Sequence, residues 1–208
     1  MSFKNILSFF LLAAFSLFKM TTQAEMPKEQ SYQFTIQKQI YPLATFFSIH
    51  SEDIYRGVVK KSAFRLRTNY DLSNVDGWQA SGIKRVLSLG SVYSWATEID
   101  IYDTNWNTIG MIDGQAATTA AARFSIYDKN GNLTAIAYLD HSLDHYVLAA
   151  PGSEMFPMAR LDKEIQTLES DRWIVTVYES NQIDERILRI FAAMACDMQE
   201  SIGNYYDE

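Results

Sequence analysis

The fold is decided close to the C-terminus, where residues 187–196 read ILRIFAAMAC. Arg189 is the only charged residue in this stretch, so a helix formed by it has no wide polar face. Such a helix is either enclosed by protein or embedded in a membrane. A membrane span needs about 20 apolar residues, roughly twice the length of this run. We therefore predict an enclosed helix over about residues 183–200, with Asn181 as its N-cap.

The chain from residue 31 onward has the pattern of short β-strands. In residues 172–178, the apolar side chains of Trp173, Val175 and Val177 recur with the period of two that is typical of a half-buried strand. Comparable strands are predicted at residues 33–40, 44–50, 63–67 and 95–102, and turn-forming residues occur at 76–77, 103–105, 128–131 and 151–152. Many short strands at this spacing predict a mainly β fold, a sandwich or a barrel, formed by one domain over residues 25–208.

One hairpin sequence occurs twice. Residues 101–107 read IYDTNWN and residues 126–132 read IYDKNGN, and each copy is followed by an apolar stretch that ends at Asp113 or Asp140. Each copy indicates strand, tight turn and strand, because Asn and Gly tolerate the positive φ that such turns need. A meander of these hairpins, closed into an antiparallel β-barrel, would leave no sheet edge exposed and would cover the apolar helix.

The hairpin of residues 126–133, combined with the C-terminal apolar helix of residues 187–196, resembles the tubby C-terminal-like barrel superfamily. That superfamily includes the LURP-one-related proteins and the phospholipid scramblases. The resemblance covers roughly residues 31–202 and implies a closed barrel of about twelve strands, threaded by its own hydrophobic C-terminal helix. Superfamily members are mostly cytosolic or face the cytosol, whereas this chain has the features of an exported protein. Their membrane-linked functions are therefore an analogy.

The N-terminus has the pattern of a secretory signal peptide. Lys4 supplies the positive charge, residues 6–18 form the apolar stretch, and residues 22–24 offer small side chains for cleavage. We predict cleavage after residue 24 and export to the periplasm or the exterior. An uncleaved N-terminal anchor is the alternative, although the apolar run is short for a membrane span.

The composition excludes broad nucleic-acid binding. The formal net charge of −7 becomes −9 once Lys4 and Lys19 are removed with the signal peptide, and phosphate contact requires positive charge. The single cysteine, Cys196, rules out an internal disulfide and lies in the apolar stretch, where we predict a small buried core residue rather than a reactive thiol.

A basic stretch is the first candidate for a binding site. Five cations fall within twelve residues that contain no acid: Arg56, Lys60, Lys61, Arg65 and Arg67. The functional interpretation is a surface for anionic lipid headgroups or another acidic partner, because a basic residue near such a surface contributes about 1 kcal/mol. The alternative is the ordinary solvated face of a strand.

A second candidate is the segment Asp140-His141-Ser142-Leu143-Asp144-His145. His141 and His145 would share a face and bind a metal if the segment were helical, but it is predicted to join two strands, where this spacing gives no such convergence. Loop polarity is then the simpler explanation. Residues 128–132 lack the twelve-residue frame of a calcium loop, and the chain has no phosphate-binding glycine loop or nucleophile elbow. We expect no cofactor.

Three function classes remain. The first is a non-enzymatic, exported binding or scaffold module of the tubby-like kind, in peripheral contact with lipid or a membrane surface. The second is a lipocalin-like carrier of a small apolar ligand, in which the C-terminal helix would pack outside the barrel. The third is a metal-dependent hydrolase that uses His141 and His145. The nearly all-round apolar character of residues 187–196 favours the first class.

Overall fold

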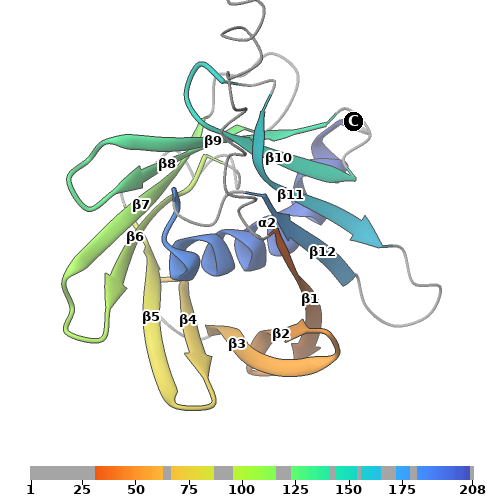
Figure 1. Cartoon of the computed structure of the whole chain (residues 1–208). Helices are drawn as coiled ribbons and strands as arrows, with labels where there is room; N and C mark the ends of the chain where they lie inside the picture. Colours follow the sequence, from red (N-terminus) through yellow and green to blue (C-terminus); the bar gives the residue numbers. More distant parts are fainter. Residues whose placement is uncertain are drawn as a thin grey trace, which may run out of the picture.

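The computed structural model describes residues 31–62, 67–86, 96–115, 123–140, 144–153, 156–164, 172–178 and 182–206 (Figure 1). The strands of this part of the chain are β1 (Tyr32–Tyr41), β2 (Ala44–Ser51), β3 (Ile54–Ser62), β4 (Asn69–Asn74), β5 (Gly77–Lys84), β6 (Glu98–Asp103), β7 (Thr108–Gln115), β8 (Arg123–Asp128), β9 (Leu133–Leu139), β10 (His145–Ala149), β11 (Pro157–Glu164) and β12 (Arg172–Val177).

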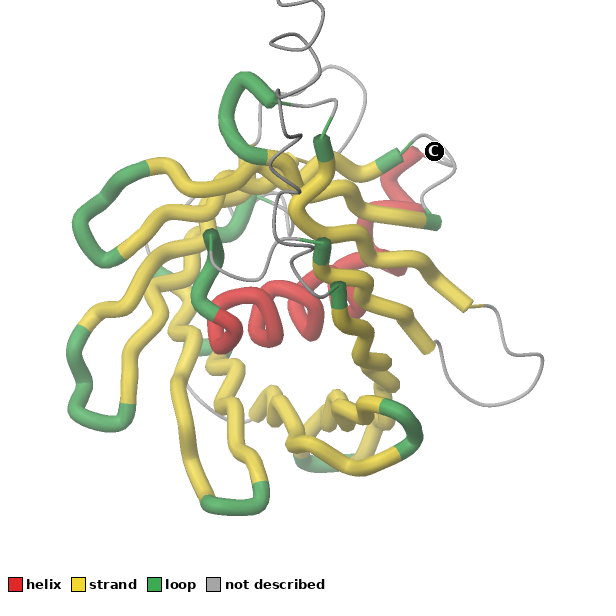
Figure 2. Tube along the Cα trace, viewed as in Figure 1, coloured by secondary structure: helices red, strands yellow, loops and turns green. Residues whose placement is uncertain are grey.

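These strands form a closed antiparallel barrel. Each strand pairs with the next one along the chain, and β12 pairs with β1 to complete the ring. In the closing pair, Tyr32 lies opposite Val177 and Gln37 lies opposite Arg172. Figure 2 shows the strands arranged as a wall around the single described helix. The predicted closed barrel is confirmed, and the number of described strands agrees with the twelve that the resemblance implies.

Most predicted strands and turns are found where the sequence placed them. β1, β2 and β12 agree with the predicted strands to within two residues, and the twin hairpin sequences form the turns between β6 and β7 and between β8 and β9. The strand predicted at residues 95–102 starts only at Glu98, where pairing with Asp113 of β7 begins. Of the strand predicted at residues 63–67, only Arg67 is described, and it lies in a bend.

The helix α2 (Glu185–Tyr206) lies inside the barrel (Figures 1 and 2). Residues 190–195 are each 0% exposed and belong to the same core as the inward side chains of the strands. This confirms the enclosed apolar helix. The predicted N-cap, Asn181, is wrong: the helix begins at Glu185, and Asp184 Oδ1 accepts a hydrogen bond of 2.9 Å from the backbone N–H of Arg186. Asn181 itself lies outside the described residues.

Two glycines allow the helix to pack directly on the backbone of the wall. A Cβ atom at Gly110 of β7 would lie 2.5 Å from Ile187 Cδ1 and 2.5 Å from the carbonyl oxygen of Tyr127. A Cβ atom at Gly82 of β5 would lie 2.9 Å from Ile190 Cγ2. Such distances are too short for real side chains, so a larger residue at either position would push the helix away from the strands.

The apolar character of α2 does not extend far enough to make it a transmembrane segment. No helix in the described part of the chain combines the length and the hydropathy that crossing a membrane requires. Cys196 is 1% exposed and packs in the core, which confirms the prediction that it is a buried core residue.

Candidate functional site

One carboxylate inside the barrel gathers three polar side chains from the wall. Asp197 Oδ2 accepts a hydrogen bond of 2.5 Å from Lys61 Nζ and one of 2.9 Å from the hydroxyl of Tyr70, while Lys38 Nζ lies 3.7 Å from Asp197 Oδ1. The side chains of Lys38 and Asp197 are each only 10% exposed. The cluster therefore joins α2 to β1, β3 and β4.

The electrostatics of this cluster favour a fixed network. Burial raises the pKa of Tyr70 well above its ordinary value, and the charge of Asp197 with its hydrogen bond raises this pKa further. The phenol consequently stays protonated and donates to the carboxylate. Lys61 and Lys38 bring positive charge to the same carboxylate, so the cluster has the features of a structural tie between helix and wall.

The predicted basic surface is only partly assembled. Lys61 points into the barrel, where it contacts Asp197. Its neighbour Lys60 faces the opposite side, because adjacent residues of a strand alternate in direction. Lys60 remains outside, with its Nζ atom 5.7 Å from the ring centroid of Phe46. Arg56 is exposed near the start of β3, and Arg67 is exposed in the loop before β4, at the opposite end of the barrel. Arg65 lies outside the described residues. The four described cations do not form one continuous patch.

An exposed apolar turn lies next to Lys60. The turn joins β1 to β2, and its residues Ile40, Tyr41 and Leu43 are 71%, 54% and 67% exposed. The Tyr41 ring packs edge-on against Phe46 at 5.4 Å, and Phe46 in turn lies opposite Lys60 in the pairing of β2 with β3. We call Ile40, Tyr41, Pro42 and Leu43 the apolar turn. An apolar tip beside a cation is a typical surface for contact with a lipid headgroup region.

Of the two histidines predicted as candidate metal ligands, only His145 lies in the described part of the chain. His145 is the first residue of β10, and its Nε2 atom lies 3.8 Å from Asp140 Oδ2 at the end of β9. The segment thus connects two strands, as the sequence predicted, and His141 lies outside the described residues. Among the described residues, no group of three or more His, Cys, Asp or Glu side chains has the proximity that metal binding needs.

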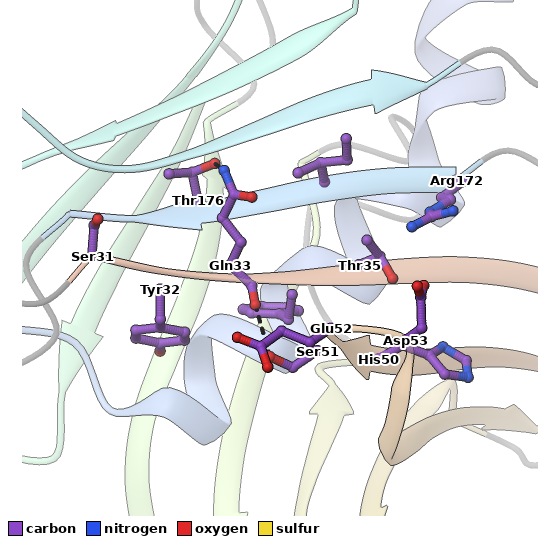
Figure 3. A pocket seen from close by; sticks show the side chains of 12 residues that line it. Ser31, Tyr32, Gln33, Thr35, His50, Ser51, Glu52, Asp53, Arg172 and Thr176 are labelled. Atoms are coloured by element: carbon purple, nitrogen blue, oxygen red, sulfur yellow. Dashed lines mark hydrogen bonds between the residues drawn. The ribbon is translucent and has the colours of Figure 1, made fainter.

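A wide groove of about 780 Å³ crosses the outside of β1 and β12 (Figure 3). Gln33 and Thr35 line it from β1, and Arg172 and Thr176 line it from β12. The end of β2 and the β2–β3 turn contribute further polar side chains, including His50, Ser51, Glu52 and Asp53. Figure 3 shows that the lining comes from these three segments. The groove therefore carries charges of both signs.

Several polar groups of this groove are engaged in structural contacts. Ser51 Oγ donates a hydrogen bond of 3.0 Å to the carbonyl oxygen of Gln33, and Gln33 Nε2 donates one of 2.9 Å to Thr176 Oγ1. The His50 ring packs against Tyr55 at 5.8 Å. Arg172 Nε lies 3.4 Å from a carboxylate oxygen of Glu164 without the geometry of a hydrogen bond. The groove therefore offers a polar surface.

A smaller cleft of about 290 Å³ is lined by β4, β5 and the β6–β7 turn, and its lining includes two tryptophans. The rings of Trp78 and Trp106 are 5.2 Å apart, and Tyr102 lies 6.1 Å from Trp106. Below the indoles, Ser81 Oγ donates a hydrogen bond of 2.5 Å to Asp71 Oδ1. Ser81 is only 2% exposed although it faces outward. We call Asp71, Trp78, Ser81, Tyr102 and Trp106 the aromatic cleft.

A β-bulge turns Trp78 toward this cleft. In the pairing of β4 with β5, Leu72 lies opposite Ala80 but Ser73 lies opposite Trp78, so one extra residue is accommodated between them. The extra residue reverses the facing of Trp78 relative to Ala80, which points inward and is 0% exposed. Periodicity alone places the two residues on the same face. The bulge is the reason that sequence reasoning missed this site.

The second tryptophan occupies an unusual backbone position. Trp106 has φ 63°, in the left-handed region that bulky residues rarely adopt, while Gly131 at the corresponding position of the twin turn has φ 80°. The two turns are otherwise alike: Asp103 Oδ1 accepts from the backbone N–H groups of Asn105 and Asn107, and Asp128 accepts from the equivalent pair at 130 and 132. The repeat in the sequence was the signal that could have singled out Trp106.

The same hydrogen bonds lower the pKa of the aspartate in each turn. The bonds from Asn107, with further bonds from Asn105, lower the pKa of Asp103. The bonds from Asn132 and Asn130 lower the pKa of Asp128 in the same way. Both carboxylates are therefore held ionised as acceptors, which keeps the two turns closed at neutral pH.

Comparison with known proteins adds no assignment. No protein-family model matches the chain, and no curated protein matches it.

Proposed function

We propose that this chain is an exported, non-enzymatic binding module that engages its partner with the outside of the barrel. The observation that carries this proposal is the enclosed helix, because residues 190–195 of α2 are each 0% exposed. The helix occupies the space in which a lipocalin-type carrier holds its ligand. The fold is also what the resemblance to the tubby-like superfamily implies, although membership of that superfamily and export both stay predictions.

We infer that the partner is an anionic membrane surface, contacted by the apolar turn together with Lys60. The exposed side chains of Ile40, Tyr41 and Leu43 can enter the boundary between headgroups and acyl chains, and Lys60 beside them adds electrostatic attraction. Arg67 lies at the same end of the barrel. Lys61 is committed to Asp197 in the interior and is no longer part of the proposed surface.

Flotation of the purified protein with lipid vesicles tests this proposal. We expect the protein to float with vesicles that contain phosphatidylserine more than with vesicles of phosphatidylcholine alone, and to float less with the phosphatidylserine vesicles as salt is raised. An Ile40→Ser/Leu43→Ser variant should lose most of the binding, because it removes the apolar tip without touching the core. A Lys60→Gln/Arg67→Gln variant should bind more weakly and lose most of the salt dependence.

The matched control is Lys129→Gln, which removes an exposed cation from the β8–β9 turn at the opposite end of the barrel. Its flotation should equal that of the wild type. Equal flotation by the wild type and the Ile40→Ser/Leu43→Ser variant would reject the apolar turn as the contact surface. The search for a partner would then move to the groove across β1 and β12.

A further inference from the structure

We propose that the aromatic cleft binds a quaternary ammonium group, such as the trimethylammonium of choline. The cleft is separate from the surface proposed for anionic lipid, because Trp106 lies in the β6–β7 turn and Trp78 lies next to the β4–β5 turn. Both turns are at the end of the barrel opposite the apolar turn. The inference therefore does not depend on the proposed function.

The backbone of Trp106 is strained in a way that its turn does not require. A left-handed conformation is strained for a bulky residue, whereas glycine adopts it freely. The twin turn has Gly131 at the same position, so this turn does not need a tryptophan in order to close. Trp106 is also 59% exposed, so burial returns little of that cost. Strain of this kind that the fold does not require indicates a functional position.

A row of three side chains crosses the strands next to the indoles. Asp71 lies opposite Ser81, and Ser81 lies opposite Tyr102, so the carboxylate, the hydroxyl and the phenol ring follow one another across three strands. Trp78 and Trp106 contact each other above this row at 5.2 Å. The cleft thus combines two indole rings with one carboxylate, and the Tyr102 ring lies beside Trp106. Aromatic rings together with a carboxylate are an arrangement that attracts a cation.

The hydrogen bonding inside the cleft favours a cation that has no N–H group. Trp78 Nε1 already donates to the carbonyl oxygen of Ala80 at 2.9 Å and lies 3.2 Å from Ser81 Oγ, and Ser81 Oγ already donates to Asp71. Sugars and primary amines need several hydrogen-bonding partners when they leave water. A quaternary ammonium needs none, because it has no N–H group. The lining therefore fits a methylated cation better than either of those ligands.

Lys60 of the outer wall points away from the cleft. Lys60 lies opposite Asp71 in the pairing of β3 with β4, but its ammonium lies over Phe46 of β2, on the far side of β3. The volume of about 290 Å³ lies just below the range of roughly 300–1,000 Å³ for ligand sites, which suits a small headgroup.

Titration with tetramethylammonium, followed by tryptophan fluorescence and by calorimetry, tests the proposal. We expect a saturable change with tetramethylammonium and with choline, and binding at least about tenfold weaker with ethanolamine, which is similar in shape to choline but carries N–H groups. Glucose should give no saturable change. No saturation with tetramethylammonium, or equal binding of ethanolamine, would overturn the assignment.

Three variants connect the binding to the cleft. Trp106→Gly installs the residue of the twin turn, so it should fold normally and bind tetramethylammonium about tenfold more weakly or not at all. Asp71→Asn should weaken binding severalfold, since it removes the negative charge and keeps an acceptor for Ser81. Phe156→Ala removes another exposed aromatic side chain, outside the cleft, and should bind like the wild type. Unchanged affinity in Trp106→Gly would overturn the proposal.

Binding to phosphatidylcholine vesicles, with and without competing choline, shows whether the ammonium group belongs to a lipid or to a soluble compound. If these vesicles retain the Ile40→Ser/Leu43→Ser variant but not Trp106→Gly, the ligand is a lipid headgroup. If free choline binds and the vesicles retain neither protein, the ligand is a soluble trimethylammonium compound. Because the two variants affect different surfaces, failure of the membrane proposal and failure of the cleft proposal give distinguishable results.

Discussion

Neighbouring residues of β4 face two different environments. Tyr70 points inward, is 2% exposed and donates its hydroxyl to Asp197 of the helix. Asp71 points outward and accepts from Ser81 in the aromatic cleft. Lys61 and Lys60 of β3 divide in the same way, one toward Asp197 and the other toward Phe46. The inner face of the wall therefore holds the fold together, whereas the outer face is available for binding.

The largest effect is expected from a charge placed in the middle of the inner core. Ala193 is 0% exposed, so Ala193→Asp buries an unpaired carboxylate, which costs several kcal/mol. We expect the variant to lose the folded barrel, as measured by circular dichroism and hydrogen exchange. Thr104→Asp, in the exposed β6–β7 turn, is the control and should fold. A stable Ala193→Asp protein would contradict the enclosed helix.

Removing the carboxylate of Asp197 should be the next most damaging change. Asp197→Ala leaves Lys38 and Lys61 without their shared partner in the interior, and we expect a loss of about 3 kcal/mol in the free energy of unfolding. Urea denaturation measures this loss. Asp197→Asn keeps an acceptor for Tyr70 and should fall between Asp197→Ala and the wild type. If Asp197→Ala has the same urea midpoint as the wild type, the contacts of Asp197 with the barrel wall have no structural role.

On the outer wall, the twin turns allow the cost of the Trp106 backbone to be measured directly. Gly131→Trp introduces the same left-handed tryptophan into the β8–β9 turn, away from Trp78 and Tyr102, and should destabilise the protein by about 1–2 kcal/mol. Trp106→Gly should change stability by less, because relief of strain offsets the lost ring contacts. Thermal unfolding of the two variants gives both values. Equal stability of Gly131→Trp and the wild type would remove the strain argument.

The smallest effect concerns Tyr70 and has a pH signature. Because burial and Asp197 raise its pKa in the folded state, Tyr70 stabilises the fold fully below its unfolded pKa of about 10, and this stability is lost as pH rises further. Tyr70→Phe should cost about 1 kcal/mol at neutral pH by removing one hydrogen bond. It should also reduce the loss of stability in alkali. Identical pH profiles for the two proteins would show that Tyr70 is not the titrating group.

The parts of the structure that could be predicted are those that repeat or extend over many residues. The all-round apolar run at residues 187–196 was sufficient to predict an enclosed helix, and the twin hairpins were sufficient to predict an antiparallel meander. Both inferences depend on burial, which the sequence pattern reports directly.

The candidate sites were harder to predict because they depend on the facing of single residues. Lys60 and Lys61 are adjacent in the sequence and therefore lie on opposite sides of a strand, so a cluster of charge along the chain is not a cluster in space. Trp78 faces the cleft only because a bulge lies between it and Ala80. The inner partner of Lys61 is Asp197, at the position where the sequence showed only a return of polarity after the apolar run.

The closing pair of the barrel also determines when the protein can fold. Tyr32 pairs with Val177, so the ring cannot close before β12 has been synthesised, and the helix that fills it follows still later. Pairings between such distant residues make folding slow, because a long loop of chain must be ordered first. Until α2 has left the ribosome, the inner faces of the strands have no core to pack against. The barrel therefore cannot complete its core before α2 has been synthesised.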